Sequence, residues 1–318
     1  MNFLSFYIRS TLDSFRDTKR IVNHFRLASH NGFIVIIKLF FIRLLFFFST
    51  IRNLIKIKIK SNYNFSDYFL LDNISSENLA REIDKKGCTN VFLLKNNLIE
   101  EIKREVFLSR DLEYKKNPNI DESKLIKLEE EEESSYFQRL KKNKISRVTG
   151  FIDLNKETVI KNLLTSKPFL SLASNYLNTN QVSISAAFFI SNPVEISESE
   201  KYANAQYFHW DNDFTKFLKL YIYLSDVDLE SGPHIFIPYT HKKKLFQHRL
   251  CRLYSDSSIL TSYNEVIKFI GKKGSIFFVD SYGLHKGETP KANSRLIINV
   301  HYGRNKILYS NKDIHIDI

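Results

Sequence analysis

Cysteine, glycine and tryptophan are scarce in this chain of 318 residues, which contains two Cys, nine Gly and one Trp. Cys88 and Cys251 lie far apart and form no Cys-x-x-Cys pair. This spacing argues against a disulfide scaffold and against a thiolate metal cluster, so a reducing cytoplasm is the expected compartment. Hydrophobic residues make up 43% and charged residues 26% of the chain, a balance typical of a globular protein and unlike that of a disordered one.

The chain also lacks an apolar run that is both long and free of charge. GFIVIIKLFFIRLLFFFSTI, at 32–51, is nearly all apolar from Phe33 to Phe48, but Lys38 and Arg43 interrupt it. A transmembrane helix needs about 20 apolar residues with few or no charges. On a helix the two cations would lie about 140° apart, which leaves a wide apolar arc. The run therefore predicts an amphipathic helix, while its late start and the absence of a cleavage site argue against a signal peptide.

Positive charge is concentrated in the same part of the chain. Residues 1–60 hold eleven Lys and Arg against two acidic residues, so nine of the twelve net positive charges lie there. An apolar helix with a basic border, which here includes the KIKIK run at 56–60, suits the interface of an anionic membrane. The alternative is a buried helix that packs on the catalytic body or on another subunit. No nucleic-acid partner is expected, because the cations alternate with aliphatic residues and form no solvent-facing stripe.

We divide the chain into this basic, apolar helical segment, 1–60, and a globular domain, 61–318. Within the domain, a capped helix is expected at 76–87 and an amphipathic helix at 97–109, with a short buried strand between them. The charged stretch 109–147, including the acidic run Glu129–Glu133, is interpreted as a solvated helix or a mobile excursion. Five consecutive glutamates lack the alternating ligands and the turn glycine of a calcium loop.

From residue 181 onward the pattern changes to strands. Runs rich in β-branched and aromatic residues are bounded by Gly- and Pro-containing turns. These runs are VSISAAFFI, KLYIYLSDV, HIFIP, VIKFI, GSIFFVD and RLIINVHYG. Such a series predicts a mostly β protein with flanking helices, built as an antiparallel sandwich or jelly roll.

The stretch FHWDNDF, at 208–214, contains the first candidate site. Alternation along a strand places His209 and Asp211 on the same face. His285, directly after the strand GSIFFVD, is the candidate third ligand. Two histidines and one carboxylate with open positions form the facial triad of non-heme Fe(II) oxygenases. Two alternatives remain: a zinc-bound, cupin-like barrel, since zinc takes the same ligands, and an unrelated sandwich with an exposed His and Asp.

Arg295 begins the strand RLIINVHYG, ten residues after His285. Its planar guanidinium suits the carboxylate of a co-substrate such as 2-oxoglutarate. Arg295, Asn299 and His301 share one face of that strand with Ile297, and this face is more polar than the other. It is therefore the expected lining of an active site.

Together, HWD, LYIYLSDVDLESGPHIFIPYTHKK and GSIFFVDSYGLHKGETPKANSRLIINVHYG resemble the phytanoyl-CoA dioxygenase-like group of Fe(II)/2-oxoglutarate dioxygenases. The resemblance is strong over 205–303, faint over 75–200, and does not extend to 1–60. It implies a double-stranded β-helix, also called a jelly-roll or cupin-like core. It also implies roles for individual residues: iron ligands at His209, Asp211 and His285, a 2-oxoglutarate anchor at Arg295 and an aromatic wall at Tyr221. Asn299, on the polar face of the strand that Arg295 begins, is a further candidate contact of the co-substrate.

The resemblance further implies Fe(II), 2-oxoglutarate and O2 as cofactor and co-substrates, and hydroxylation of a C–H bond with release of succinate and CO2. Members of this group act on acyl thioesters, amino acids, small natural products and sugars, so the substrate stays open. The N-terminal segment favours a lipid or glycolipid substrate and a position on the inner face of a membrane. The alternative function is a non-catalytic or zinc-bound barrel that binds a membrane surface. Of the remaining histidines, His241 is expected to be structural, and His234 to face the pocket mouth or solvent.

Overall fold

The computed structural model describes residues 55–71, 73–107, 112–115, 133–211, 216–249, 253–304 and 314–318. No helix within these ranges is long and apolar enough to cross a bilayer. The apolar run 33–48, on which the predicted membrane contact depends, lies outside the described residues, and so does the acidic run up to residue 132.

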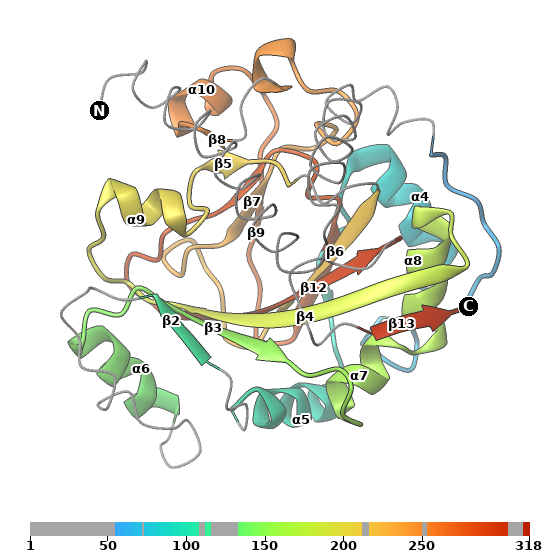
Figure 1. Cartoon of the computed structure of the whole chain (residues 1–318), viewed down its shortest axis with the longest axis horizontal. Coiled ribbons are helices and arrows are strands. Elements are labelled where there is room, and N and C mark those ends of the chain that lie inside the picture. Colours follow the sequence, from blue (N-terminus) through green and yellow to red (C-terminus); the bar gives the residue numbers. More distant parts are fainter. Residues whose placement is uncertain are drawn as a thin grey trace, which may run out of the picture.

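Two antiparallel sheets form the body of the protein (Figure 1). The larger sheet has the strand order β1-β10-β6-β12-β4-β3-β2, and β13 also pairs with β4. Its strands are β1 (Phe92–Leu93), β2 (Leu112–Lys115), β3 (Arg147–Ile152), β4 (Gln181–Ser191), β6 (Phe217–Tyr223), β10 (Ser275–Val279), β12 (Arg295–Gly303) and β13 (Ile314–Asp317). The predicted jelly-roll core with flanking helices is confirmed.

The smaller sheet has the order β8-β5-β11-β7-β9 and consists of very short strands. They are β5 (Phe208–His209), β7 (His234–Phe236), β8 (Leu253–Tyr254), β9 (Ile267–Phe269) and β11 (His285–Gly287). The six predicted strand runs from residue 181 onward all form strands, and the strand expected at FHWDNDF is present as the short β5, whereas β8, β11 and β13 have no counterpart among the predictions.

The larger sheet is apolar on both faces, which explains why its strands are nearly continuous hydrophobic runs. Alternate residues of β12, such as Leu296 and Ile298, join the main core with Ile83 of helix α4 (Ser76–Lys86) and Phe169 of helix α8 (Lys167–Leu177). On the opposite face Ile297 lies in a second core. That second core contains Tyr221, Tyr223, Phe236, Phe269 and Phe277 and thus joins the two sheets. Arg295 and Asn299 lie on the face of Ile297, between the sheets.

Helices cover the outer face of the larger sheet (Figure 1). The helices of this layer are α4 (Ser76–Lys86), α5 (Asn96–Phe107), α6 (Glu133–Lys142), α7 (Val159–Leu164) and α8 (Lys167–Leu177). Outside this layer the described residues form α9 (Glu198–Ala203), α10 (Asp256–Leu260) and the 3-10 helix η3 (Phe246–Arg249). The helix predicted at 76–87 is confirmed as α4, which begins after Ser75, whose side chain accepts a hydrogen bond from the Asn78 amide. The helix predicted at 97–109 is confirmed as α5.

The C-terminal end of α4 packs against the segment that follows β7. Gly87 terminates the helix with a φ of 92°, and a Cβ there would lie 2.6 Å from Nδ1 of His241. His241 donates its Nε2–H to the carbonyl oxygen of Asp84 (3.0 Å). Close approach therefore requires glycine at position 87, and His241 has the structural role expected of it.

The KIKIK run at 56–60 is an extended segment on the surface of α8. The Lys58 and Lys60 amides donate to the backbone carbonyl (3.2 Å) and the side-chain Oδ1 (2.8 Å) of Asn175. Ile57 and Ile59 pack against the main core, while the lysines alternate to the outside. We assigned this run to the basic border of the N-terminal segment, but its contacts place these residues on the globular body.

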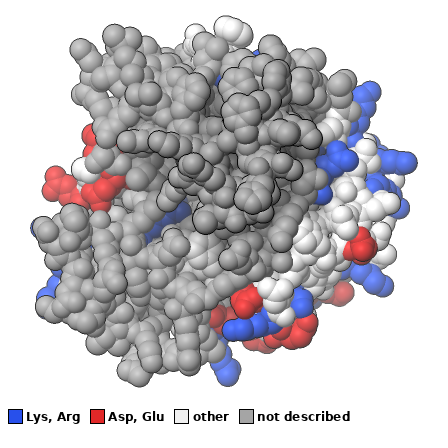
Figure 2. Space-filling model, viewed as in Figure 1, with Lys and Arg blue, Asp and Glu red and all other residues white. Residues whose placement is uncertain are grey.

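Charged side chains of the described residues are of both signs on the face seen in Figure 2, where blue and red groups lie interspersed around the edge of the molecule.

Gly150 offers a test of the packing between β3 and β4. It pairs with Phe188, whose ring is fully buried, and a Cβ at Gly150 would lie 2.1 Å from Cε1 of that ring. We expect Gly150→Ala to lower the free energy of unfolding by about 1–3 kcal/mol, because the close-packed core cannot give way. Urea denaturation measures this change.

The double variant Gly150→Ala/Phe188→Leu is the control, because leucine lacks the ring atoms that would clash. Its loss of stability should be smaller than the sum of the two single losses. Additive losses would show that the close contact between Gly150 and Phe188 is not what limits this position.

Candidate metal centre

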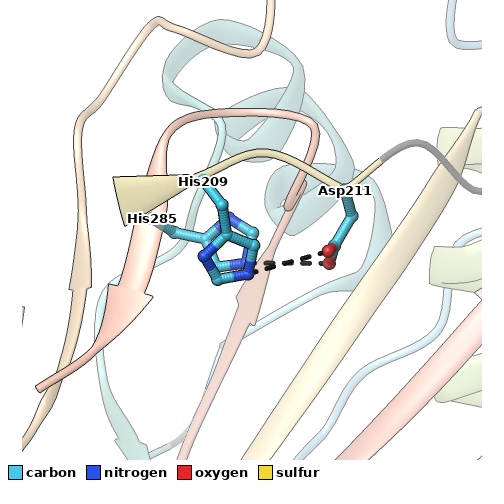
Figure 3. Close-up of side chains that lie close together, drawn as sticks. All are labelled: His209, Asp211 and His285. Atoms are coloured by element: carbon cyan, nitrogen blue, oxygen red, sulfur yellow. Dashed lines mark ion pairs between the residues drawn. The ribbon is translucent and has the colours of Figure 1, made fainter. Parts of the chain in front are cut away.

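Two short neighbouring strands bring the histidines of the candidate site together. His209 on β5 pairs directly with His285 on β11, and their ring centroids are 4.2 Å apart. Asp211 follows two residues after His209, and Ser281 holds it in two ways. The Asp211 amide donates to the Ser281 carbonyl (2.8 Å), and the Ser281 hydroxyl donates to Oδ2 of Asp211 (2.8 Å). Figure 3 shows both rings directed toward the carboxylate.

Hydrogen bonds determine which ring nitrogen of each histidine faces the carboxylate. Nδ1 of His209 donates to the Tyr207 carbonyl, and Nδ1 of His285 to the Gly283 carbonyl, both at 2.9 Å. In the neutral imidazole Nε2 is then an acceptor. The two Nε2 atoms lie 3.8 and 3.6 Å from the Asp211 oxygens (Figure 3).

The two Nε2 acceptors thus face the carboxylate oxygens of Asp211, which are also acceptors, and these atoms repel one another. A cation bound between them would be attracted to all of them. One ligand atom from each of His209, Asp211 and His285 lies within 4.8 Å of the others. Two imidazole nitrogens and one carboxylate oxygen in this arrangement fit a divalent transition metal that keeps open positions. The carbonyl partners of both Nδ1 atoms act as the outer support that metal-binding histidines commonly have.

The opposite side of the HxD strand is apolar, as its alternation requires. Phe208 and Trp210 belong to a separate buried cluster with Tyr282, and the rings of Trp210 and Tyr282 meet edge to face at 5.4 Å. The buried Lys244 lies 3.6 Å from the Tyr282 ring centroid and donates to the Thr240 carbonyl (2.9 Å). This cluster supports the strand behind its two ligands.

A cavity of about 220 Å³ opens beside the three ligands. The sequence-predicted site residues all line it, which brings together segments more than eighty residues apart along the chain. These residues are His209, Asp211, Tyr221, His285, Arg295 and Asn299. Tyr221 forms part of an aromatic wall, stacked on Phe277 at 5.3 Å. The Oδ1 atom of Asn299 is buried without a hydrogen-bond partner in the described part of the chain.

Arg295 is buried at the start of β12. Its Nη1 donates to the Gly232 carbonyl and its Nη2 lies 3.5 Å from the Ser191 hydroxyl, whereas Nε has no hydrogen-bond partner among the described residues. A Cβ at Gly287 would lie 3.2 Å from Nη2, so a glycine leaves space for the guanidinium. Burial lowers the pKa of Arg295, yet an arginine stays charged at neutral pH. This buried cation is well suited to an anionic ligand.

A second arginine, Arg147, lines the same cavity and was missed by the sequence analysis. Arg147 and Arg295 flank Ser191 on β4, because each of them pairs with it. The Arg147 guanidinium lies over the Phe189 ring at 4.2 Å, and burial together with the neighbouring Arg295 lowers its pKa to about 10. We interpreted 109–147 as solvated or mobile, and for Arg147 that interpretation is wrong. The alternating pattern of RVTGFI was the available signal for a strand.

His234 also lines the cavity, with only 4% of the residue exposed. Its ring lies 4.4 Å from that of Tyr221 and is stacked on His285 at 5.4 Å. Burial, with a smaller contribution from His285, holds the pKa of His234 well below its usual value. The residue was expected at the pocket mouth or in solvent, and it is instead a neutral part of the cavity wall.

A family model described as phytanoyl-CoA dioxygenase (PhyH) matches residues 104–295. No curated protein matches the chain.

Three solved structures are similar at low sequence identity. EctD from S. alaskensis with bound Fe is 13% identical over 78% of this chain and 88% of that chain, with a TM-score of 0.49. HygX from Streptomyces hygroscopicus with nickel and 2-oxoglutarate is 12% identical over 71% and 86%, with a TM-score of 0.47. The α-ketoglutarate-dependent epimerase SnoN from nogalamycin biosynthesis is 11% identical over 74% and 85%, with a TM-score of 0.46.

The buried histidine His301 leads to a prediction about pH. It lies on the inner face of β12, with its ring stacked on Phe217 at 5.3 Å, and burial, followed by the charge of Lys219, holds its pKa well below 6.5. Below pH 6.5 the unfolded chain therefore binds a proton that the folded protein does not, so stability is present at higher pH and is lost as the pH falls. His301→Phe should reduce the loss of unfolding free energy between pH 7.5 and 5.5 by up to about 1.4 kcal/mol.

Urea titrations of the metal-free protein at the two pH values provide the measurement. The control is His315→Gln, which changes an exposed histidine on β13 and should retain the wild-type pH dependence. An unchanged pH dependence in His301→Phe would contradict a neutral, buried His301.

Proposed function

This chain belongs to the phytanoyl-CoA dioxygenase family, whose model matches residues 104–295. On that premise we propose that the chain hydroxylates a C–H bond, and that His209, Asp211 and His285 bind the catalytic iron. The family consists of non-heme iron enzymes that use 2-oxoglutarate and O2, and the chain is therefore an enzyme of this type. We propose that the substrate is a small molecule, a lipid or a glycolipid.

The observation that carries the proposal is the convergence of two Nε2 acceptors and one carboxylate at the wall of the cavity. The carbonyls of Tyr207 and Gly283 hold the two rings in the tautomer that a metal requires. Ser281 holds the carboxylate. When bound, Fe(II) with 2-oxoglutarate and O2 supplies the oxidation of a C–H bond, with succinate and CO2 as co-products.

We assign the distal carboxylate of 2-oxoglutarate to the end of the cavity at Ser191. Arg295 and Arg147 both pair with Ser191, so two guanidiniums line this end. A guanidinium fork binds a carboxylate through two parallel hydrogen bonds, and the unpartnered Nε of Arg295 supports this assignment. Tyr221 and Asn299, which pair across β6 and β12, line the path from there toward the ligands.

Aromatic packing excludes water from the wall behind this path. Phe269 and Phe277 stack at 4.0 Å, and Phe277 in turn stacks on Tyr221. A dry wall strengthens the electrostatic contacts of the co-substrate with the arginines and reduces side reactions of the oxidising site.

For residues 1–60 the proposal remains the one drawn from the sequence, namely contact with the anionic inner face of a membrane and a lipid-linked substrate. Nine of the twelve net positive charges lie in this segment beside its apolar run. Co-sedimentation of the full-length chain with anionic liposomes tests it, and a protein that stays wholly in the supernatant would contradict it.

Turnover of 2-oxoglutarate in the absence of substrate tests the catalytic proposal. With Fe(II) and ascorbate the purified chain should form succinate slowly, and Asp211→Ala should lower this rate by about 100-fold or more, because loss of a direct ligand exceeds the 10–100-fold cost of losing an outer support. Asp67→Ala changes an exposed aspartate and should retain the wild-type rate. If wild-type protein neither forms succinate nor binds 2-oxoglutarate, the chain acts as a non-catalytic barrel.

Binding of 2-oxoglutarate to the Ni(II)-loaded protein tests the role of Arg295. Arg295→Lys keeps the charge but loses the fork, so the dissociation constant should rise by about 10-fold or more. Calorimetry measures it, with the exposed Arg81→Lys as the matched control. An unchanged affinity in Arg295→Lys would place the distal carboxylate elsewhere in the cavity.

A further inference from the structure

Lys219 places a positive charge directly beside the candidate metal centre. It lies on β6 and lines the cavity, its Nζ is 3.9 Å from Oδ2 of Asp211, and 13% of its side chain is exposed. The ammonium group thus faces the carboxylate that we assign to the metal. Nothing in the proposed binding of iron or 2-oxoglutarate assigns a role to this lysine.

The register of the sheet separates Lys219 from the two arginines. Lys219 pairs with His301 on β12, whereas Arg295 begins that strand six residues earlier and pairs with Ser191. Six residues correspond to about 20 Å between Cα positions along a strand, and the two long side chains line the same cavity from these separate positions. Arg147 shares the arginine end, because it also pairs with Ser191. The cations therefore lie at two ends of the cavity, with Arg147 and Arg295 at one and Lys219 at the other. Asp211 lies at the same end as Lys219.

This separation determines where each ligand lies. 2-Oxoglutarate held by Arg295 and the metal occupies the space between them. Lys219 lies beside the metal, at the end of the cavity away from the arginines. A group that contacts Lys219 is therefore a part of the substrate and not the distal carboxylate of 2-oxoglutarate.

The charge balance of the cavity points in the same direction. Its described lining contains three cations, Arg147, Lys219 and Arg295, but one carboxylate, Asp211. A divalent metal adds two positive charges and 2-oxoglutarate removes two, so two positive charges remain in excess. Excess charge of one sign in a buried cavity is costly, and an anionic ligand reduces that cost.

We propose that Lys219 binds an anionic group of the substrate, a carboxylate or a phosphate, next to the metal. This inference depends on the proposed function. Because Nζ of Lys219 is 3.9 Å from an oxygen of the ligand Asp211, the anionic group lies close to the metal. The carbon that is oxidised is then close to the anionic group in the substrate, within a few bonds of it. The enzyme is accordingly selective for anionic small molecules over neutral and cationic ones.

Anion binding to the full-length protein loaded with Ni(II) and 2-oxoglutarate tests this proposal independently of turnover. The probes are inorganic phosphate and propionate, measured by calorimetry. At least one of them should bind the wild type. Lys219→Met, which removes the charge and keeps the length, should weaken that binding by about 10-fold or more, and Lys219→Arg should retain most of it. Lys272→Met, on an exposed lysine, is the matched control and should bind the probe as the wild type does.

Three results overturn the inference. In the first, neither probe binds the wild type. In the second, a probe binds Lys219→Met as tightly as it binds the wild type. In the third, Lys219→Met loses affinity for Ni(II) or 2-oxoglutarate in parallel with the probe, which shows that the lysine supports the metal site alone. Failure of the proposed function itself is distinguishable, because the wild type then fails to bind Ni(II) or 2-oxoglutarate before any probe is added.

A substrate screen provides the second measurement. Compounds that raise succinate formation above the uncoupled rate should carry a carboxylate or phosphate, and Lys219→Met should raise their KM more than it lowers kcat. A neutral or cationic substrate whose kinetic constants are the same in wild type and Lys219→Met contradicts the proposal.

Discussion

The pairing of β5 with β11 is the interaction on which the site depends. It places His209 opposite His285, and the turn before β11 supplies Ser281, which holds Asp211. The paired stretch is only two or three residues long in each strand, so its backbone hydrogen bonds alone contribute little. The aromatic cluster of Phe208, Trp210 and Tyr282 behind the strand supplies the burial that the short ladder lacks. Apolar packing on one face thus positions polar ligands on the other.

The larger sheet meets a related constraint, because it is covered on both sides. Leu296 and Ile298 of β12 join the helix-covered core, whereas Ile297 joins the core between the sheets. Arg295 and Asn299 share this inner face, where Arg295 is buried and Asn299 is half-buried, although both are polar. A slip of one residue would exchange the two faces and place the arginine among the helices, so the hydrophobic pattern of β12 also fixes the position of the co-substrate anchor.

The sequence predicted those parts of the molecule that have a local pattern. Long strands such as β4 and β12 were evident from their β-branched and aromatic runs, and the ligands followed from the alternation of His209 and Asp211 and from a histidine after a strand. Strands of two or three residues have no period to detect. Arg147 was missed because its place in the cavity depends on pairing with Ser191, which is a property of the register. Lys219 was missed because its role depends on its closeness to Asp211, which lies on another segment and is not evident from the sequence.

The uneven charge of the cavity explains why its ligands and its stability are coupled. Folding places the half-buried Arg147 beside the buried Arg295, and desolvation lowers the pKa of each, so both cations are less stable there than in water. On the proposed assignment, a dianion at the arginine end would reduce the repulsion between the two guanidiniums, and a metal would offset the repulsion between the acceptor atoms of His209, Asp211 and His285. If the proposed assignment holds, both ligands would bind partly by relieving this unfavourable electrostatics, and the site would be selective for a cation flanked by anions.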